Sequence, residues 1–386
     1  MDVLLFYPIL FQKGGADRVL LEIARAFNAP IYTGIYRKES TFSEFSELDV
    51  REVRQPVLDK SLFFLQNNVA AKGFALTSAK FLAHKVREDY DVINAHGTPS
   101  NWVRNRNERV CWYFYSPVRS AFDLYEYRVA GLPLKKRVVR DAMFSAYKFM
   151  ESVIDPKIEK TVSVSPYVNV RDASFISKYI RKPVEPVPPG VDEKLFVNES
   201  YGKYFLYPSR MIPEKRLEYA IGAFREFCKK KKGWKLILTG FQPQRERELK
   251  YMETLKSLAS GLDVEFRMDI PEKELRNLYA NAYAVLFCAM NEDWGLVPLE
   301  AMASEKPCIS VNEGGPSYSI VDGKTGFLVN SPAQMAEKML LLAENPGENE
   351  KMGRQGRKRV LENYTWAAFL KKMENAFMEV AKSKIQ

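Results

Sequence analysis

Residues 203–289 contain the pattern that decides the fold, because short apolar runs alternate there with stretches of helical period. The apolar runs are KYFLYPSR (203–210), WKLILTG (234–240), VEFRM (264–268) and YAVLFCA (283–289). Amphipathic stretches separate them: LEYAIGAFREFCKK (217–230), RERELKYMETLKSLAS (245–260) and PEKELRNLYANA (271–282). Such alternation is typical of parallel sheets with crossover helices. The sequence therefore predicts an α/β unit in this half of the chain.

The first half repeats the pattern in VLLFYP (3–8), ADRVLLEIARAF (16–27), PIYTGIY (30–36) and DVINAH (91–96). The two halves are joined by RKPVEPVPPGVDEKLF (181–196), where four prolines prevent a helix and favour an extended connector. We therefore predict domains at residues 1–195 and 196–365, with a cleft between them and an amphipathic helix at 366–386. Only residues 100–182 resist this interpretation, because aromatic and basic residues blur their periodicity.

Composition agrees with a globular, two-domain protein. A length of 386 residues suggests two or three domains, and a hydrophobic fraction of 46% excludes wholesale disorder. The four cysteines lie far apart without a C-x-x-C pair, so we interpret them as free, buried thiols in a reducing compartment. The segment MDVLLFYPILFQKGGADR lacks a basic leader and a cleavage site, and its apolar run is too short to span a bilayer. These features predict a cytoplasmic protein.

The net charge is positive, since 58 basic residues exceed 48 acidic ones by 10. A positive surface attracts the phosphates of nucleic acid, anionic lipid or nucleotides, although a merely solvated basic face is an equal alternative. The sequence has no zinc-knuckle spacing, helix-turn-helix signature or RNP-type strand, which disfavours nucleic acid. The segment LPLKKRVVRDAMFSAYKFM (132–150) combines basic with apolar and aromatic residues. It is either an interfacial helix on an anionic membrane or an ordinary surface helix.

The first group of candidate site residues lies in PSRMIPEKRLEYA (208–220), where a strand leads through a turn into a helix. Strand ends and helix starts face the ligand crevice of α/β sheets. The guanidinium of Arg210 and the ammonium of Lys215 at such a place suit a diphosphate, although basic surface residues alone would serve solubility.

The second group lies in NEDWGLVPLEAM (291–302), where a buried strand ends at a polar loop before a helix. Exposed amides of the loop and helix start could hold phosphate oxygens, while the carboxylates of Glu292 and Glu300 could accept hydrogen bonds from neutral hydroxyls. Phosphate and polyol together describe a nucleotide sugar. The alternative makes Glu300 a surface helix residue and Glu292 a helix cap.

These motifs together resemble the family 4 retaining glycosyltransferases, which have the GT-B fold. The resemblance rests on Arg210 with Lys215, on the glycine of KLILTG, on the Glu292 and Glu300 pair, and on GGPSYSIVDGKTGFLV (314–329). It continues in the first half through GGADRVL (14–20), DVINAHG (91–97), WYFYSPVRSAFDLY (112–125) and VPPGVDEKLF (187–196). The resemblance implies two Rossmann-like parallel-sheet domains that face a cleft, with a C-terminal helix that crosses back to the first domain.

The resemblance also implies roles for individual residues. Arg210 and Lys215 would neutralise the donor diphosphate, Glu300 would bind the ribose, and Glu292 would lie beside the donor sugar. The amides of Gly295, Leu296 and Val297 would face phosphate or sugar oxygens, and Gly14 with Gly15 would form a flexible loop near the acceptor and the diphosphate. No permanently bound cofactor and no metal would be required.

This chain departs from the family at two places. Relatives usually have histidine just before the SP-x-R segment, whereas here Tyr115 occupies that position, so His96 at the end of DVINAH becomes the alternative candidate. Tyrosine does not titrate near neutrality as histidine does. In VEFRMDI, relatives commonly have glycine near Met268, so the base that is recognised stays open.

The sequence thus predicts retaining transfer of a hexose, with mannose favoured because EDWGLVP resembles the version of this motif in mannosyltransferases. The donor would be a nucleotide sugar, GDP-mannose in preference to a UDP-sugar, and the acceptor a glycan or a lipid-linked glycan. The protein would be cytoplasmic, with peripheral attachment to the inner face of the cell membrane if the acceptor is membrane-borne. The alternatives are a catalytically inactive sugar- or lipid-binding protein and a sugar-nucleotide epimerase of the same fold.

Overall fold

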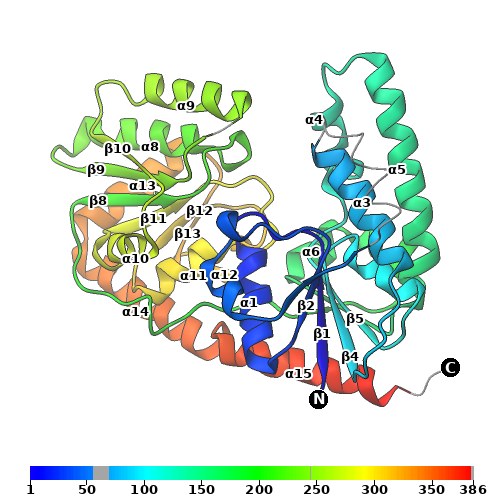
Figure 1. The fold of residues 1–386 in the computed structure, drawn as a ribbon. Helices are drawn as coiled ribbons and strands as arrows, with labels where there is room; N and C mark the ends of the chain where they lie inside the picture. The colour runs from blue at the N-terminus through cyan, green and yellow to red at the C-terminus, as the bar shows by residue number, and fades with distance from the viewer. Residues whose placement is uncertain (55–68, 244, 384–386) are drawn as a thin grey trace. The chain divides into compact units, whose positions relative to one another are not determined.

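The computed structural model describes residues 1–54, 69–243 and 245–383, and the chain forms two compact units. The first unit consists of Met1–Pro188 together with Leu370–Gln386, and the second of Pro189–Phe369. Each unit contains one parallel sheet with helices on both of its sides (Figure 1). The prediction of two Rossmann-like α/β units is therefore confirmed.

The first sheet has seven strands in the order β3-β2-β1-β4-β5-β6-β7. They are β1 (Val3–Tyr7), β2 (Ile31–Thr33), β3 (Val50–Glu52), β4 (Val92–His96), β5 (Val110–Phe114), β6 (Lys160–Ser163) and β7 (Glu185–Pro186). The helices are α1 (Gly15–Phe27), α3 (Val69–Ala83), α4 (Tyr125–Val129), α5 (Leu134–Ile154), α6 (Pro166–Arg171) and α7 (Ala173–Phe175), with a short 3-10 helix, η3 (Ser100–Asn105), after β4.

The second sheet has six strands in the order β10-β9-β8-β11-β12-β13. They are β8 (Tyr204–Pro208), β9 (Lys235–Gly240), β10 (Val264–Met268), β11 (Ala284–Phe287), β12 (Cys308–Val311) and β13 (Gly326–Val329). The helices are α8 (Leu217–Lys230), α9 (Glu246–Leu258), α10 (Glu272–Asn281), α11 (Leu296–Ala303), α12 (Pro316–Ser319), α13 (Pro332–Glu344) and α14 (Pro346–Asn363).

The central strands form because their sequences suit burial on both faces. All five residues of β1 and all four of β11 are buried, as expected for strands covered by helices on both sides. Helix α1 buries Val19, Leu20 and Ile23 against the sheet. It ends at Asn28, whose left-handed backbone (φ 46°) lets its amide cap the last turn.

The strand order places a switch point in each sheet. In the first sheet the chain reverses its direction of growth between β1 and β4, and in the second between β8 and β11. In open parallel sheets, ligands bind beyond the carboxyl ends of the strands that flank such a point. We therefore expect a ligand site at the segments that follow β1, β4, β8 and β11.

The last helix, α15 (Trp366–Lys382), begins in the second unit and continues into the first from Leu370 onward. Within the first unit, Phe377 packs edge-to-face against Phe27 of α1, with 5.2 Å between the ring centroids, and Glu379 forms an ion pair with Lys160 of β6. The predicted return of the last helix to the first unit is confirmed. Among the described residues, no helix is both long and apolar enough to cross a membrane.

Candidate functional site

The basic turn after β8 is held in place by a buried tyrosine. Tyr207, at the end of β8, donates a hydrogen bond from its hydroxyl to the backbone carbonyl of Lys215, and the same hydroxyl accepts one from the amide of Cys288 at 3.0 Å. This phenol therefore joins the turn after β8 to the loop after β11, which are the two segments that flank the switch point. Arg210 in this turn is exposed, and Lys215 is half-buried.

Lys215 and Glu292 meet beyond the carboxyl ends of these strands. The Lys215 ammonium forms an ion pair with Glu292 Oε2, across 77 positions in the sequence. An ammonium has three N–H donors, so Lys215 can hold a carboxylate and still donate to a phosphate oxygen. The structure thus brings a predicted phosphate ligand and a predicted sugar ligand into direct contact.

The loop that carries Glu292 has a defined backbone. The amide of Met290 donates to the carbonyl of Glu214 at 2.9 Å, and the amide of Gly315 donates to the carbonyl of Glu292 at 2.8 Å. At Gly314 (φ 72°) a Cβ atom would lie 2.5 Å from the carbonyl oxygen of Glu292, so only glycine permits this close packing. The double glycine of NEGGP therefore fixes the loop through backbone contacts.

The first turn of α11 follows directly. Gly295 adopts φ 85° and is the N-cap of the helix, and Leu296 and Val297 are its first residues. Amides in a first helical turn have no acceptor within the helix and lie at its positive end. Their position next to the Glu292 loop makes them candidate donors to an anionic ligand.

Glu300, one helical turn into α11, is held by Tyr279. The phenol donates to Glu300 Oε2 at 2.5 Å, and Tyr279 itself is fully buried on α10. Burial raises the pKa of Tyr279 well above its usual value, and the neighbouring Glu300 carboxylate adds to this effect, so the phenol stays a donor. Glu300 is half-buried, and its second carboxylate oxygen can accept a hydrogen bond from a ligand hydroxyl.

Met268 lies at the end of β10, farther along the same edge of the sheet. It pairs in register with Gly240 of β9, and a Cβ atom at Gly240 would lie 2.4 Å from the carbonyl oxygen of Ser209, which shows how closely the strand ends pack here. The half-buried Met268 side chain packs against the core of the second unit.

In the first unit, the candidates gather at the ends of β1, β4 and β5. Gly14 is the N-cap of α1 and Gly15 its first residue. Tyr115, just after β5, lies with its hydroxyl 3.1 Å from Nδ1 of His96 and 3.4 Å from the carbonyl oxygen of Ala16. His96 is fully buried, and burial lowers its pKa to about 3. The histidine therefore remains a neutral imidazole that solvent does not reach, and Tyr115 is among the side chains that cover it.

Sequence reasoning missed several polar residues around these candidates. Asp17, in the first turn of α1, is buried beside Tyr7 and Tyr115 and contributes to the raised pKa of both phenols, in each case after burial itself. Arg216 forms a two-point ion pair with Glu313, at 2.9 and 3.0 Å. The spacing of these residues gave no signal, although Asp17 and Arg216 lie in motifs that the sequence singled out and Glu313 directly precedes another.

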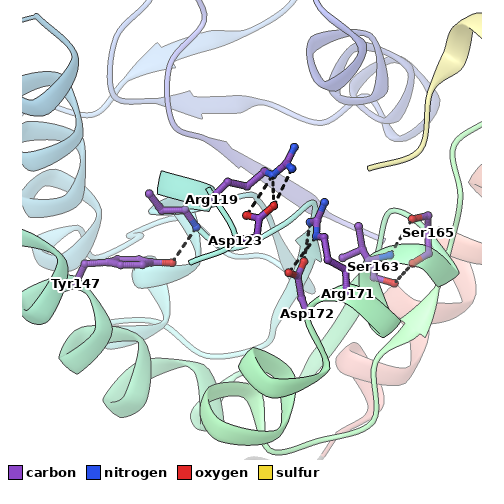
Figure 2. A network of polar contacts seen from close by, with 9 residues as sticks. Arg119, Asp123, Tyr147, Ser163, Ser165, Arg171 and Asp172 are labelled. Carbon is purple, nitrogen blue, oxygen red and sulfur yellow. Dashed lines mark hydrogen bonds and ion pairs between the residues drawn. The ribbon is translucent and has the colours of Figure 1, made fainter. Parts of the chain in front are cut away.

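A further polar cluster lies beyond the ends of β5 and β6 (Figure 2). Arg119 pairs with Asp123 at 2.7 Å and Arg171 with Asp172 at 2.7 Å, and the two pairs are close enough to affect one another, since burial raises the pKa of Asp172 while both arginines oppose that rise. Each cation thus has its own carboxylate. One pair belongs to the loop after β5 and the other to the helices that follow β6.

Comparison with known proteins identifies the second unit. Residues 192–359 match the family described as "Glycosyl transferases group 1". The alpha-1,3/1,6-mannosyltransferase ALG2 of Dictyostelium discoideum is 23% identical to this chain. The alignment covers 96% of this chain and 96% of the ALG2 sequence.

Two solved structures have the same fold. Sucrose-phosphate synthase from Thermosynechococcus elongatus superposes with a TM-score of 0.72, at 18% identity, over 98% of this chain and 99% of its own. Anabaena Alr3699/HepE in complex with UDP and glucose superposes with a TM-score of 0.71 at 15% identity. The superposition covers 98% of this chain and 99% of the HepE chain. Residues 192–359 are therefore a group 1 glycosyltransferase domain, and the chain is a glycosyltransferase of the GT-B fold that resembles mannosyltransferases.

Proposed function

We propose that this glycosyltransferase transfers a hexose, with mannose favoured, from a nucleotide sugar to a glycan or lipid-linked acceptor with retention of the anomeric configuration. The observation that carries the proposal is the contact of Lys215 with Glu292 at the switch point of the second sheet, beside the first turn of α11. A cation and helix amides suit a diphosphate, and carboxylates suit sugar hydroxyls. The preference for GDP-mannose is supported by the mannosyltransferase relative, while the UDP complex of HepE makes a UDP-sugar the second choice.

In the proposed reaction, the bond between the anomeric carbon and the diphosphate oxygen breaks as charge develops on the leaving group. Arg210, Lys215 and the amides of Gly295, Leu296 and Val297 stabilise this negative charge. The acceptor oxygen attacks the same face and forms the new glycosidic bond, while the departing phosphate takes the acceptor's proton. The Glu292 carboxylate orients sugar hydroxyls and stabilises positive charge at the anomeric carbon. Neither a metal nor a bound cofactor takes part in this scheme.

We assign donor binding to the second unit and acceptor binding to the first, with Gly14, Gly15, Tyr115 and His96 on the acceptor side. The test is a panel of nucleotide sugars, GDP-mannose among them, incubated with the purified protein with and without membrane extract. Donor-dependent incorporation of sugar, with the product's anomeric configuration read by NMR, supports the proposal. Epimerised donor, or binding without turnover under all conditions, would instead support an epimerase or an inactive binding protein.

The outer face of α5 supports attachment to an anionic membrane. Leu134, Val138, Phe149 and Val153 are 38–75% exposed, and at 3.6 residues per turn they fall within a sector of about 100°. Lys135, Lys136 and Arg137 near the start of the helix are exposed as well. Apolar side chains flanked by cations are the composition of helices that lie in a bilayer interface.

We therefore propose that the protein binds the inner face of the cell membrane through α5, and that its acceptor is presented there. In flotation with vesicles containing acidic phospholipid, bound protein should fall as salt is raised and should be lost on Val138→Asp with Phe149→Asp. Leu361→Asp, at a 49% exposed position on α14, is the matched control and should float like the wild type. Absence of flotation at low salt would leave α5 an ordinary surface helix.

A further inference from the structure

Arg216 has a backbone conformation that is unusual for a residue with a long side chain. It lies between Lys215 and the first residue of α8, and its φ of 48° falls in the left-handed region. This region costs energy for residues with a Cβ atom and is used mostly by glycine and asparagine. Such strain persists where surrounding contacts hold it, and it gathers at functional sites. The conformation therefore points to a role for the arginine side chain.

The Arg216 guanidinium joins the turn after β8 to two other loops of the second unit. Its Nε donates to the carbonyl of Cys288, directly after β11, at 2.7 Å. Its two terminal nitrogens donate to the two carboxylate oxygens of Glu313, after β12, at 3.0 and 2.9 Å. These partners lie 72 and 97 positions farther along the chain. One planar group thus connects the loops that follow three strands, β8, β11 and β12.

The three loops surround Glu292. Lys215, the neighbour of Arg216, forms an ion pair with the Glu292 side chain. Gly315, two residues after Glu313, donates from its amide to the Glu292 carbonyl at 2.8 Å. The side chain and the backbone of Glu292 are therefore held by residues next to the two ends of the Arg216–Glu313 pair. Movement of either end changes how the Lys215 ammonium and the Glu292 carboxylate lie relative to one another.

The Arg216–Glu313 pair suits orientation better than stabilisation. The two side chains are 23% and 38% exposed, and ion pairs in contact with water contribute little to the free energy of unfolding. A guanidinium that meets a carboxylate at two points fixes direction as well as distance, which an ammonium cannot do. Loss of the pair should therefore affect the geometry of the loops more than the stability of the fold.

We propose that Arg216 and Glu313 are positioning residues for the transfer reaction. They hold the turn of Lys215 and the loop of Glu292 so that the ammonium meets the departing diphosphate while the carboxylate meets the sugar. This role rests on the proposed function and makes it more specific, because it adds two residues that act through others and touch no substrate. A misplacement of about 1 Å in an active site can cost about 100-fold in rate.

Arg216→Asn tests the role, because it removes all three hydrogen bonds while asparagine tolerates the left-handed backbone. We expect kcat for sugar transfer to fall about 10- to 100-fold. The KM for the donor should change by less than about threefold, since Glu300 and the amides of α11 still bind the nucleotide. The melting temperature should stay within about 4 °C of the wild type.

Arg181→Asn is the matched control. Arg181 also has a left-handed backbone (φ 58°), but it is exposed at the end of a short helix in the first unit and donates to the nearby carbonyl of Lys178. This variant should keep the wild-type kcat. Equal losses of kcat in Arg181→Asn and Arg216→Asn, or an unchanged kcat in Arg216→Asn, would overturn the proposal.

A double-mutant cycle tests whether the two residues act as a pair. Glu313→Gln keeps the shape of the side chain and removes its charge, so kcat should fall by less, about 3- to 10-fold. The double variant should be no slower than Arg216→Asn alone, because the contact is already lost there. Independent, multiplicative losses would contradict a shared role.

The connection between the loops can be observed without turnover. In hydrogen exchange followed by mass spectrometry, amides of residues 286–293 and 312–318 should exchange faster in Arg216→Asn than in the wild type, and at the wild-type rate in Arg181→Asn. Unchanged exchange would overturn the proposal even if the protein transfers sugar. A wild type that transfers no sugar from any donor removes the proposed function, and the catalytic role of the pair with it, whatever the exchange result.

Discussion

Replacing Glu151 by glutamine should remove a pH-dependent loss of stability from the first unit. Glu151 near the end of α5 and Asp155, four residues later, are both fully buried. Glu151 accepts from the indole of Trp102 at 2.6 Å, and Asp155 accepts from the amide of Asn101 at 2.8 Å. Burial raises the pKa of both carboxyl groups, that of Glu151 to about 7, and the neighbouring Glu151 carboxylate raises the pKa of Asp155 further.

The size of the effect follows from that value. The folded state binds the Glu151 proton more tightly than the unfolded chain, whose pKa for glutamate is about 4.3 to 4.5. As pH rises from about 4.5 to about 7, the unfolded chain gives up the proton while the folded protein keeps it, so the free energy of unfolding falls. A shift of about 2.5 pKa units corresponds to roughly 3 kcal/mol lost across this window. Above pH 7 the loss is complete.

Glutamine at this position keeps the acceptor for Trp102 and supplies an amide donor toward Asp155. Urea unfolding at pH 5, 6, 7 and 8, followed by tryptophan fluorescence, should show Glu151→Gln close to the wild type at pH 5 and more stable by up to about 3 kcal/mol at pH 8. Glu126→Gln removes a charge at an exposed position of α4 and should follow the wild-type curve throughout. Parallel pH profiles for the wild type and Glu151→Gln would refute the reasoning.

Three further expectations concern the second unit. Arg210→Ala combined with Lys215→Ala should cut turnover by more than it weakens binding of the free nucleoside, and equal effects in kinetics and in nucleoside titration would contradict a diphosphate role. Glu300→Ala should weaken nucleotide binding measured by calorimetry, and Tyr279→Phe should do so by less while lowering stability by about 1 kcal/mol. Burial lowers the pKa of Lys306 to about 7, so below pH 7 the folded protein bears the full cost of burying the charged ammonium. From pH 7 toward 10 the folded protein loses this proton while the unfolded chain keeps it, so the free energy of unfolding should rise. Thermal melts of Lys306→Met should lack this rise.

The strands of both units could be predicted because parallel strands are buried on both faces and so stand out as apolar runs. The motifs at their ends follow from the rule that ligands lie at the carboxyl ends of parallel strands, and this rule predicts both Lys215 and Glu292 as site residues. The contacts that hold these motifs escaped prediction. Tyr207 and Tyr279 look like ordinary core aromatics in the sequence, and only the packing of strands and helices gives each hydroxyl its polar partner.

The region from 100 to 182 could not be interpreted because α5 inverts the usual distribution of side chains. It buries Glu151 and exposes Leu134, Val138 and Phe149, so that an assumption of apolar residues inside and polar residues outside fails. The contact of His96 with Tyr115 was equally hidden. It depends on the register of β4 against β5, which the sequence does not display.

The division of the chain has a consequence for its synthesis. The second unit is one continuous segment, Pro189–Phe369, whereas the first needs Leu370–Gln386 to complete its core, where Phe377 is fully buried. During translation the second unit can fold as soon as its segment has left the ribosome. The first unit must wait with an unfinished apolar surface until the final helix arrives. Its completion therefore follows the emergence of the whole second unit, and protection of that surface by a chaperone matters most in the interval before residues 370–386 emerge.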